Sequence, residues 1–289
     1  MTLPLQILIL SDGKAGHENQ SHGLAEAMAR RHAAEIRILT LEEKPGAIAR
    51  VRKAIAESRK FPDPDFIIAA GHATHLSLLC LSRKYGARSI LLMKPLLPMG
   101  FFDWCVIPEH DFKQPPAAKN VILSKGALNR VVCVPGAKSG NLILVGGPSK
   151  THGYDETKLV EQIKRVTTEG SWQVADSRRT PASFFTALGK AVSNVEFIPH
   201  QATEPGWLAA KLSEVEQVRV TEDSVSMIYE ALSSGCRVGI LEMPGIRKSS
   251  RVIGGLERLR AEGYFESSEN GRPPVLAEAD RCAKIILGE

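Results

Sequence analysis

The chain has 289 residues, of which 43% are hydrophobic and 24% charged, values that exclude a disordered or collagen-like protein. At about 100–200 residues per domain, this length predicts two domains. Thirty-seven Lys and Arg residues against 32 Asp and Glu residues give a net charge of +5. A surplus this small fits an anionic small molecule or an acidic membrane surface. The small positive charge, together with an aromatic content of only 6%, argues against nucleic acid binding.

Cysteine usage and the N-terminal segment indicate the compartment. The five cysteines are widely spaced and form no C-x-x-C pair, which argues against a zinc ribbon, a redox dithiol or an oxidising compartment. The apolar run Leu3–Leu10 lacks a preceding basic region and a cleavage site, so it predicts a first strand rather than a signal peptide. No segment reaches the ~18 apolar residues of a membrane span. We therefore expect a cytoplasmic protein, for which peripheral contact with the inner membrane is open.

Short apolar runs alternate with helical patterns in the first half of the chain. We expect strands at Gln6–Leu10, Ile36–Leu39, Phe66–Ala70, Ser89–Met93, Trp104–Ile107 and Asn120–Leu123, and helices at Ser21–Arg31, Ala47–Arg59 and His75–Tyr85. Alternation of helices with continuously apolar strands predicts a parallel, doubly wound sheet.

The pattern breaks into a Pro/Gly/Ser loop at residues 133–141 and then starts again. We expect strands at Leu142–Val145, Trp172–Ala175, Val195–Ile198, Val218–Thr221 and Val238–Leu241, and helices at Glu156–Thr168, Pro181–Ala191, Gly206–Ser213, Val225–Ser233, Ser249–Glu262 and Ala277–Ile286. The chain is thus predicted to be α/β, with two Rossmann-like domains (1–135 and 136–289) facing a cleft and the last helix packing on either one. Ligands are expected where the strands end.

The loop Ser11–Gln20 follows the first strand and is rich in ionisable groups. Its glycines allow a tight turn and close approach to an anion, but it is neither a P-loop nor a dinucleotide fingerprint. Asp12, His17 and Glu18 are each able to accept a proton from a hydroxyl nucleophile. The alternative is a polar loop that only caps the next helix.

Three loops in the second half carry groups suited to a diphosphate. Gly146-Gly147, followed by Ser149 and Lys150, offers backbone N–H groups, a hydroxyl and a charge, although it also fits an ordinary turn. Arg178 and Arg179 precede a predicted helix that Thr180 is expected to cap. Their positive charges are unfavourable near the positive end of the helix dipole, and a bound anion would relieve this repulsion. The alternative is that both arginines are solvated or paired. The third loop leads into the predicted helix in Thr221–Ala231, where the hydroxyls of Ser224 and Ser226 precede Glu230. Glu230 is either a ligand of the ribose hydroxyls or a solvent-exposed residue of an ordinary helix.

Other nucleophile and metal patterns are weak. His72 and His75 have near-metal spacing but no third ligand follows, so capping or lining roles are favoured over a metal site. No G-x-S-x-G elbow supports acyl transfer. No D-x-D-type metal motif is present.

Five segments together resemble the mitochondrial-fission Elm family over nearly the whole chain. They are Ser11–Gln20, Phe102–Asp111 with its Pro-Glu-His-Asp, Gly126–Arg130, Ser177–Pro181 and Thr221–Met227. Bacterial members are regarded as GT-B glycosyltransferases, so the resemblance implies a C-terminal domain for a nucleotide sugar and an N-terminal domain for the acceptor. The fission role of eukaryotic members is not carried over.

The resemblance also implies roles for individual residues. Because the family pattern has Asn at the position of His17, Glu18 and Asp12 are favoured as the catalytic residues. The implied acceptor-side residues are Gly13, Lys14, Gly16, His17 and His110. The implied nucleotide-sugar ligands are Gly146, Gly147, Ser149, Lys150, Ser177, Arg178, Arg179, Thr180, Asp223, Ser224, Ser226, Met227 and Glu230.

The sequence therefore predicts a metal-independent transferase, without a resident cofactor, that moves a sugar from a nucleoside-diphosphate sugar to a hydroxyl of an envelope glycan or glycolipid. Helix N-termini and arginines would stabilise the leaving diphosphate. A sugar-nucleotide epimerase of the same fold and a non-catalytic binding or scaffold protein are the alternatives. Nucleotide binding without turnover would favour the scaffold.

Overall fold

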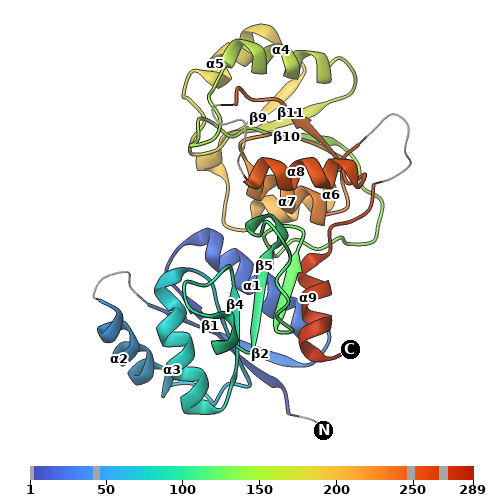
Figure 1. Ribbon diagram of the computed structural model, residues 1–289. Helices are drawn as coiled ribbons and strands as arrows, with labels where there is room; N and C mark the ends of the chain where they lie inside the picture. Colours follow the sequence, from blue (N-terminus) through green and yellow to red (C-terminus); the bar gives the residue numbers. More distant parts are fainter. Residues whose placement is uncertain (1–2, 42–45, 246–250, 267–272) are drawn as a thin grey trace. The chain divides into compact units, whose positions relative to one another are not determined.

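The computed structural model describes residues 3–41, 46–245, 251–266 and 273–289. The chain forms two compact units (Figure 1): residues 1–130 with 277–289, and residues 131–276. The sequence places the boundary at residues 135 and 136 and leaves open on which domain the last helix packs. In the structure that helix is part of the first unit.

The first unit is built on a parallel sheet with the strand order β2-β1-β3-β4-β5-β6. Its strands are β1 (Leu5–Ser11), β2 (Ala34–Thr40), β3 (Phe66–Ala69), β4 (Arg88–Leu92), β5 (Trp104–Pro108) and β6 (Val121–Ser124). Its helices are α1 (Ala15–Ala29), α2 (Ala47–Ser58), α3 (His75–Tyr85) and α9 (Glu278–Leu287), with short 3₁₀ turns η1 (His72–Thr74), η2 (Met99–Phe101) and η3 (Glu109–Asp111).

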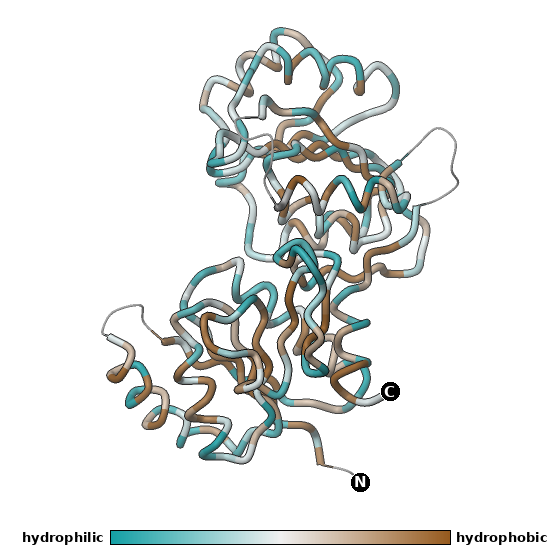
Figure 2. Tube along the Cα trace, in the orientation of Figure 1, coloured by the Kyte–Doolittle hydropathy of each residue, from teal (hydrophilic) through white to brown (hydrophobic). Residues whose placement is uncertain are grey.

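Strand β1 shows why both faces of this sheet are covered. Ile7 and Ile9 pack with residues of α1 and α9, whereas Leu8 and Leu10 point to the other face and pack with residues of α2 and α3. Successive side chains of a strand alternate between faces, so a continuously apolar strand needs helices on both sides. In Figure 2 the strands are mainly brown, that is hydrophobic, whereas the helices beside them carry both brown and teal residues.

The second unit contains a parallel sheet with the order β11-β10-β7-β8-β9. The strands are β7 (Asn141–Leu144), β8 (Trp172–Ala175), β9 (Val195–Ile198), β10 (Gln217–Thr221) and β11 (Arg237–Leu241). The helices are α4 (Glu156–Val166), α5 (Phe184–Ala191), α6 (Trp207–Glu214), α7 (Val225–Ser233) and α8 (Arg251–Ala261), with the 3₁₀ turn η4 (His200–Ala202). Ser249, where the sequence placed the start of α8, lies outside the described residues.

In the second unit, helices likewise cover both faces of the sheet. Leu159 and Ile163 of α4 and Phe184 and Leu188 of α5 are buried against one face of the sheet. Figure 1 shows α6, α7 and α8 on the opposite face. The prediction of two α/β units with parallel sheets is confirmed.

Two helices start at positions that the sequence misplaced. Helix α1 begins at Ala15 rather than Ser21, because the turn that precedes it is completed at Gly13, whose φ of +76° suits glycine, and Glu18 lies favourably in the first turn. Gly16 and His17 are therefore helical. Helix α5 begins at Phe184 rather than Pro181.

All five cysteines are free thiols. Burial raises the pKa of Cys105 and of Cys282 to about 12, so neither is a ready thiolate. Among the residues that the structure describes, no helix combines the length and apolar character needed to cross a membrane.

Candidate functional site

Strand order identifies one position in each sheet where a ligand is expected. In open parallel α/β sheets, ligands bind beyond the carboxyl ends of the strands, at the point where the order of connection reverses. This point lies between β1 and β3 in the first sheet, and between β7 and β10 in the second. Polar side chains gather at both positions.

At the end of β1, Asp12 and His17 form a carboxylate–imidazole pair. Nδ1 of His17 lies 3.0 and 2.9 Å from the two carboxylate oxygens. The Asp12 side chain is 1% exposed and that of His17 is 25% exposed. Because an ionised carboxylate only accepts hydrogen bonds, this contact favours the tautomer with its proton on Nδ1, in which Nε2 is the acceptor.

Gly71, beyond the end of β3, leaves the space that this pair occupies. A Cβ at Gly71 would lie 2.4 Å from Oδ2 of Asp12 and 2.6 Å from Nδ1 of His17, and the residue has a φ of +92°. Both the steric space and the backbone conformation therefore require glycine. No motif in the sequence singles out Gly71, although its position after a predicted strand is a usable signal.

Glu18 makes a different contact in the same turn of α1. The Ser11 hydroxyl donates a hydrogen bond to Oε1 of Glu18 and accepts one of 2.8 Å from the Gly13 amide. Lys14 lies at the edge of the group, with Nζ 3.8 Å from Asp12. Glu18 thus anchors α1 to the end of β1, and Asp12 is shielded behind His17.

The remaining predicted acceptor-side histidine is more distant in the sheet. His110 lies in η3, at the carboxyl end of β5, and β4 separates β5 from β3. His75, by contrast, is a buried histidine packed edge-on to Phe102, and its Nε2 has no hydrogen-bond partner among the described residues. Burial, and secondarily His72, lowers the pKa of His75 to about 4, so it is neutral near pH 7. Within the described ranges, no three His, Cys, Asp or Glu side chains are arranged to hold a metal ion.

The second group of polar side chains forms where β7 and β10 end. The Gly146 amide donates to Oγ1 of Thr221 at 2.7 Å, and the Gly147 amide donates to Oδ2 of Asp223 at 3.1 Å. A Cβ at Gly146 would lie 2.2 Å from Oγ of Ser224. This first glycine is therefore required for the loop to lie against the start of α7.

Arg179 holds this arrangement together from the β8 side. Its Nη2 lies 2.7 Å from Oδ2 of Asp223 and donates to Oγ of Ser224 at 3.0 Å, while Nη1 donates to the Gly147 carbonyl at 3.0 Å. A Cβ at Gly147 would lie 2.0 Å from the Arg179 carbonyl oxygen. The guanidinium thus braces the two loops. Arg178 is exposed, and it has no ion pair or hydrogen bond within the described parts of the chain.

Thr180 and Ser177 belong to the same brace. Oγ1 of Thr180 donates to the Gly146 carbonyl at 2.6 Å and accepts from the Ser177 amide at 2.9 Å. The expectation that Thr180 caps the next helix is wrong, because its hydroxyl bonds across to the β7 loop. Ser183 occupies the N-cap position instead.

The other predicted donor-site residues are spread around this core. Oγ of Ser149 accepts from the Thr151 and His152 amides at 3.2 and 3.0 Å, which closes a local turn, and Lys150 is exposed. On α7, Ser226 is exposed in the first turn beside Met227, and Glu230 follows Ser226 by one turn. The structure brings Gly146, Gly147, Arg179, Thr180, Asp223 and Ser224 into direct contact.

An additional carboxylate–imidazole pair, which no sequence motif indicates, lies where the neighbouring strands β8 and β9 end. Nδ1 of His200 is 3.0 Å from Oδ1 of Asp176, which also accepts a 2.5 Å hydrogen bond from the His200 amide. Asp176 directly follows β8 and His200 begins η4 after β9. The buried hydroxyl of Tyr154 has no hydrogen-bond partner in the described structure, and burial, together with Glu156 and Asp223, raises its pKa.

Comparison with known proteins places this geometry in context. A family model described as "Mitochondrial fission ELM1" matches residues 15–289. An uncharacterized protein of Rickettsia prowazekii, RP120, is 23% identical and covers 98% of both chains.

Two solved structures share the fold at low sequence identity. The UDP-GlcNAc 2-epimerase of Methanocaldococcus jannaschii has a TM-score of 0.55 and is 10% identical, with 99% of this chain and 100% of that chain covered. Phytolacca americana UGT2, complexed with UDP-2-fluoro-glucose and pterostilbene, has a TM-score of 0.53 and is 10% identical, covering 98% and 89%. The fold is thus of the GT-B type, which is used by nucleotide-sugar enzymes.

Proposed function

Because the chain belongs to the mitochondrial fission ELM1 family and has a GT-B fold, we propose that it is a glycosyltransferase using a nucleoside-diphosphate sugar. The observation that carries this proposal is the Gly146-Gly147 loop, held against the N-terminus of α7 at the strand-order reversal of the second sheet. Amides at the start of a helix are suited to a diphosphate, and the two glycines let the loop pack closely against that helix start.

In this proposal the second unit binds the donor. The first-turn amides of α7 and the Ser226 hydroxyl receive the diphosphate, and Glu230 accepts hydrogen bonds from ribose hydroxyls. Arg178 and Lys150, which are exposed and without ion-pair partners in the described residues, supply positive charge. Charge at these positions stabilises the departing diphosphate as the bond to the sugar breaks.

The first unit supplies the base. The acceptor hydroxyl loses its proton to Nε2 of His17 while its oxygen bonds to the anomeric carbon of the sugar. The bond from that carbon to the diphosphate breaks, and the nucleoside diphosphate departs with the electron pair. Asp12 is a positioning residue, because its buried carboxylate orients His17 and stabilises the imidazolium that forms. This assigns to His17 the role that the family pattern suggests for Glu18 or Asp12.

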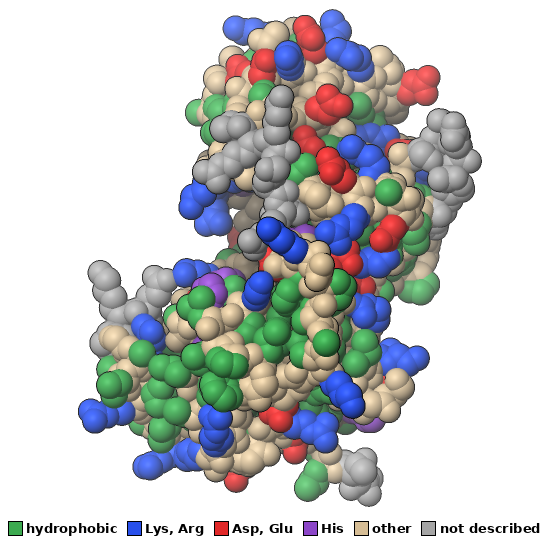
Figure 3. Space-filling view, in the orientation of Figure 1, with side chains coloured by type: hydrophobic (Ala, Val, Ile, Leu, Met, Phe, Trp, Pro, Cys, Tyr) green, Lys and Arg blue, Asp and Glu red, His purple; other side chains and the backbone are tan. Residues whose placement is uncertain are grey.

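A glycolipid acceptor at an anionic membrane surface is supported by the exterior of the first unit. Figure 3 shows hydrophobic side chains exposed over the region of α2 and α3. Ile48, Leu76, Leu96 and Phe101 are 73%, 45%, 78% and 52% exposed, and each follows the carboxyl end of β2, β3 or β4. Exposed basic residues such as Arg52 accompany them. Apolar side chains next to positive charge are what an anionic bilayer surface binds.

The proposal is tested by thermal shift against UDP, GDP, ADP and dTDP, followed by mass spectrometry of envelope lipids and glycans incubated with the matching sugar nucleotide. A ligand at 100 times its Kd stabilises a protein by about 2.7 kcal/mol, which is an easily measured shift. Stabilisation by one nucleotide and addition of the mass of the transferred sugar to an acceptor support the function. Stabilisation by none of the four contradicts it. Conversion of the sugar nucleotide to an epimer, without an acceptor, would identify an epimerase instead.

A further inference from the structure

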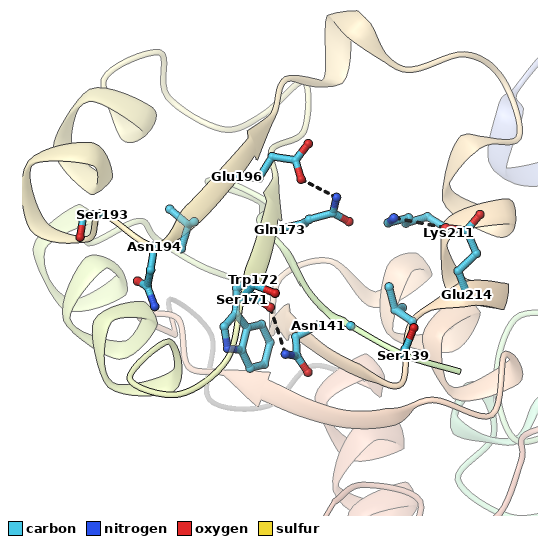
Figure 4. Close-up of a pocket in the computed structure, with 13 residues that line it drawn as sticks. Ser139, Asn141, Ser171, Trp172, Gln173, Ser193, Asn194, Glu196, Lys211 and Glu214 are labelled. Atoms are coloured by element: carbon cyan, nitrogen blue, oxygen red, sulfur yellow. Dashed lines mark hydrogen bonds and ion pairs between the residues drawn. The ribbon is translucent and has the colours of Figure 1, made fainter. Parts of the chain in front are cut away.

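A groove of about 540 Å³ lies at the opposite edge of the second sheet from the proposed donor site (Figure 4). It is formed where β7, β8 and β9 begin, together with the end of α6. Its volume is within the range of about 300–1,000 Å³ that is usual for small-molecule sites. Since the Gly146 loop follows the other end of β7, the groove has no part in the function proposed above.

The polar lining of the groove consists mainly of uncharged hydrogen-bonding groups. Nε2 of Gln173 donates to Oε2 of Glu196 at 2.7 Å, and the two residues are neighbours in the register of β8 and β9. Nδ2 of Asn141 donates to the Ser171 carbonyl at 3.0 Å. One side-chain oxygen of Gln173, of Glu196 and of Asn141 thus remains as an acceptor. The hydroxyls of Ser139 and Ser193 also border the groove.

The charges of the groove argue against an ionic ligand. Glu196 and Glu214 would repel an anion, whereas Lys211, whose Nζ lies 3.2 Å from Glu214, extends toward Gln173 and offsets one of these two carboxylates, which weakens the attraction for a cation. A neutral ligand with many hydroxyl donors fits both conditions. Hydroxyls donating to a carboxylate and to amide oxygens form charge-assisted and neutral hydrogen bonds together.

Three apolar residues, Trp172, Val195 and Val215, also line the groove. Trp172 and Val215 are only 4% and 2% exposed, so the apolar part of the lining is small and lies beside the polar groups. A sugar ring has hydroxyls at its edge and C–H groups on its faces, so it matches a lining that combines acceptors with an apolar surface. We infer that this groove binds a neutral saccharide, separately from the nucleotide-sugar site.

The test is saturation-transfer difference NMR on the full chain with glucose, N-acetylglucosamine and N,N′-diacetylchitobiose, each with and without excess UDP. We expect saturation transfer to at least one sugar, and we expect it to persist when UDP is added. A stronger signal from the disaccharide would indicate a glycan chain rather than a free monosaccharide. A signal that UDP abolishes belongs to the donor site and contradicts the inference, as does absence of transfer to all three sugars.

Variants locate the site. Glu196→Gln preserves shape but removes the charge, and it should weaken sugar binding about tenfold, as loss of a hydrogen bond to a charged group does. Glu161→Gln, on the exposed surface of α4, is the matched control and should bind like wild type. Equal binding by both variants and wild type would overturn the assignment. UDP-induced stabilisation, which should be unchanged in Glu196→Gln, keeps this outcome distinct from failure of the proposed function.

Discussion

The guanidinium of Arg179 lies 2.7 Å from the carboxylate of Asp223, whose side chain is completely shielded from solvent. A buried carboxylate needs a charged partner, and Arg179 provides it from the loop after β8. The same guanidinium bonds to the Gly147 carbonyl and to Ser224. The ion pair therefore sets the shape of the loop that we propose for the diphosphate.

Replacing the two adjacent arginines one at a time should distinguish the residue that holds the loops together, Arg179, from the residue that binds the ligand, Arg178. Arg179→Ala leaves the Asp223 carboxylate buried without its cation, so the free energy of unfolding should fall by about 3 kcal/mol in urea titrations. Arg178→Ala removes an exposed side chain and should change stability by less than about 0.5 kcal/mol. Calorimetry should show that Arg178→Ala weakens UDP binding roughly tenfold. If Arg178→Ala destabilised the fold and Arg179→Ala did not, the roles would be reversed.

Removal of the imidazole tests the proposed base. His17→Gln should lower the rate of sugar transfer by about 10²–10⁴-fold, because general base catalysis is lost, while UDP stabilises the variant as it does wild type. Transfer is measured as nucleoside diphosphate released per acceptor glycosylated.

Glu18→Gln is the matched comparison for His17→Gln. We expect it to retain more activity, because Glu18 anchors α1 through Ser11. Loss of transfer in Glu18→Gln with activity retained in His17→Gln would restore the assignment that the family pattern suggests and refute ours.

A methyl group at Gly71 should disturb the Asp12–His17 pair. Gly71→Ala places Cβ 2.4 Å from Asp12 in a backbone conformation that disfavours side chains, so both the melting temperature and the transfer rate should fall. Gly86→Ala is the control. Gly86 also has a positive φ, +66°, but nothing lies within 4 Å of its added Cβ, so only stability should drop, by about 1 kcal/mol.

Burial of His75 predicts an acid-dependent stability. Its pKa is lowered from 6.5 to about 4 in the folded state, so the unfolded chain binds more protons between these two values. The free energy of unfolding should therefore fall as pH decreases from about 6.5 to 4, by on the order of 2–3 kcal/mol from this group. Urea titrations of wild type and His75→Phe across this range check it. An equally steep decline in both would show that other groups cause the effect.

Membrane association is tested by co-sedimentation with vesicles. The chain should bind vesicles of mixed phosphatidylglycerol and phosphatidylcholine better than phosphatidylcholine alone, and the preference should weaken with salt. The double substitution Leu96→Ser and Phe101→Ser should reduce binding severalfold. Ile285→Ser, at an exposed position of α9 on the other side of the first sheet, should not reduce it. Equal binding to both vesicle types would refute an electrostatic component.

Much of the architecture follows from local sequence patterns. Continuously apolar strands such as β1 demand cover on both faces, and their alternation with helical segments is enough to predict two parallel α/β units. The same patterns located the Gly146-Gly147 loop and the start of α7, because strand ends and helix starts are local events. Local patterns predict the wrong start for α1, because the turn at Gly13 and the hydrogen bond from Ser11 to Glu18 determine where this helix begins.

The contacts within each candidate site were decided only by tertiary structure. Gly71 and Asp12 follow different strands, as do Asp176 and His200, and no local spacing indicates that they meet. Arg179 and Arg178 are adjacent and chemically identical, so the sequence alone assigned them one role. Packing of the β7, β8 and β10 loops turns the Arg179 guanidinium onto the buried Asp223 and leaves that of Arg178 without an ion pair among the described residues. The sequence by itself determined which residue types gather at the strand ends, because this depends on local pattern, whereas only the fold decided which of them touch, because this depends on strand order.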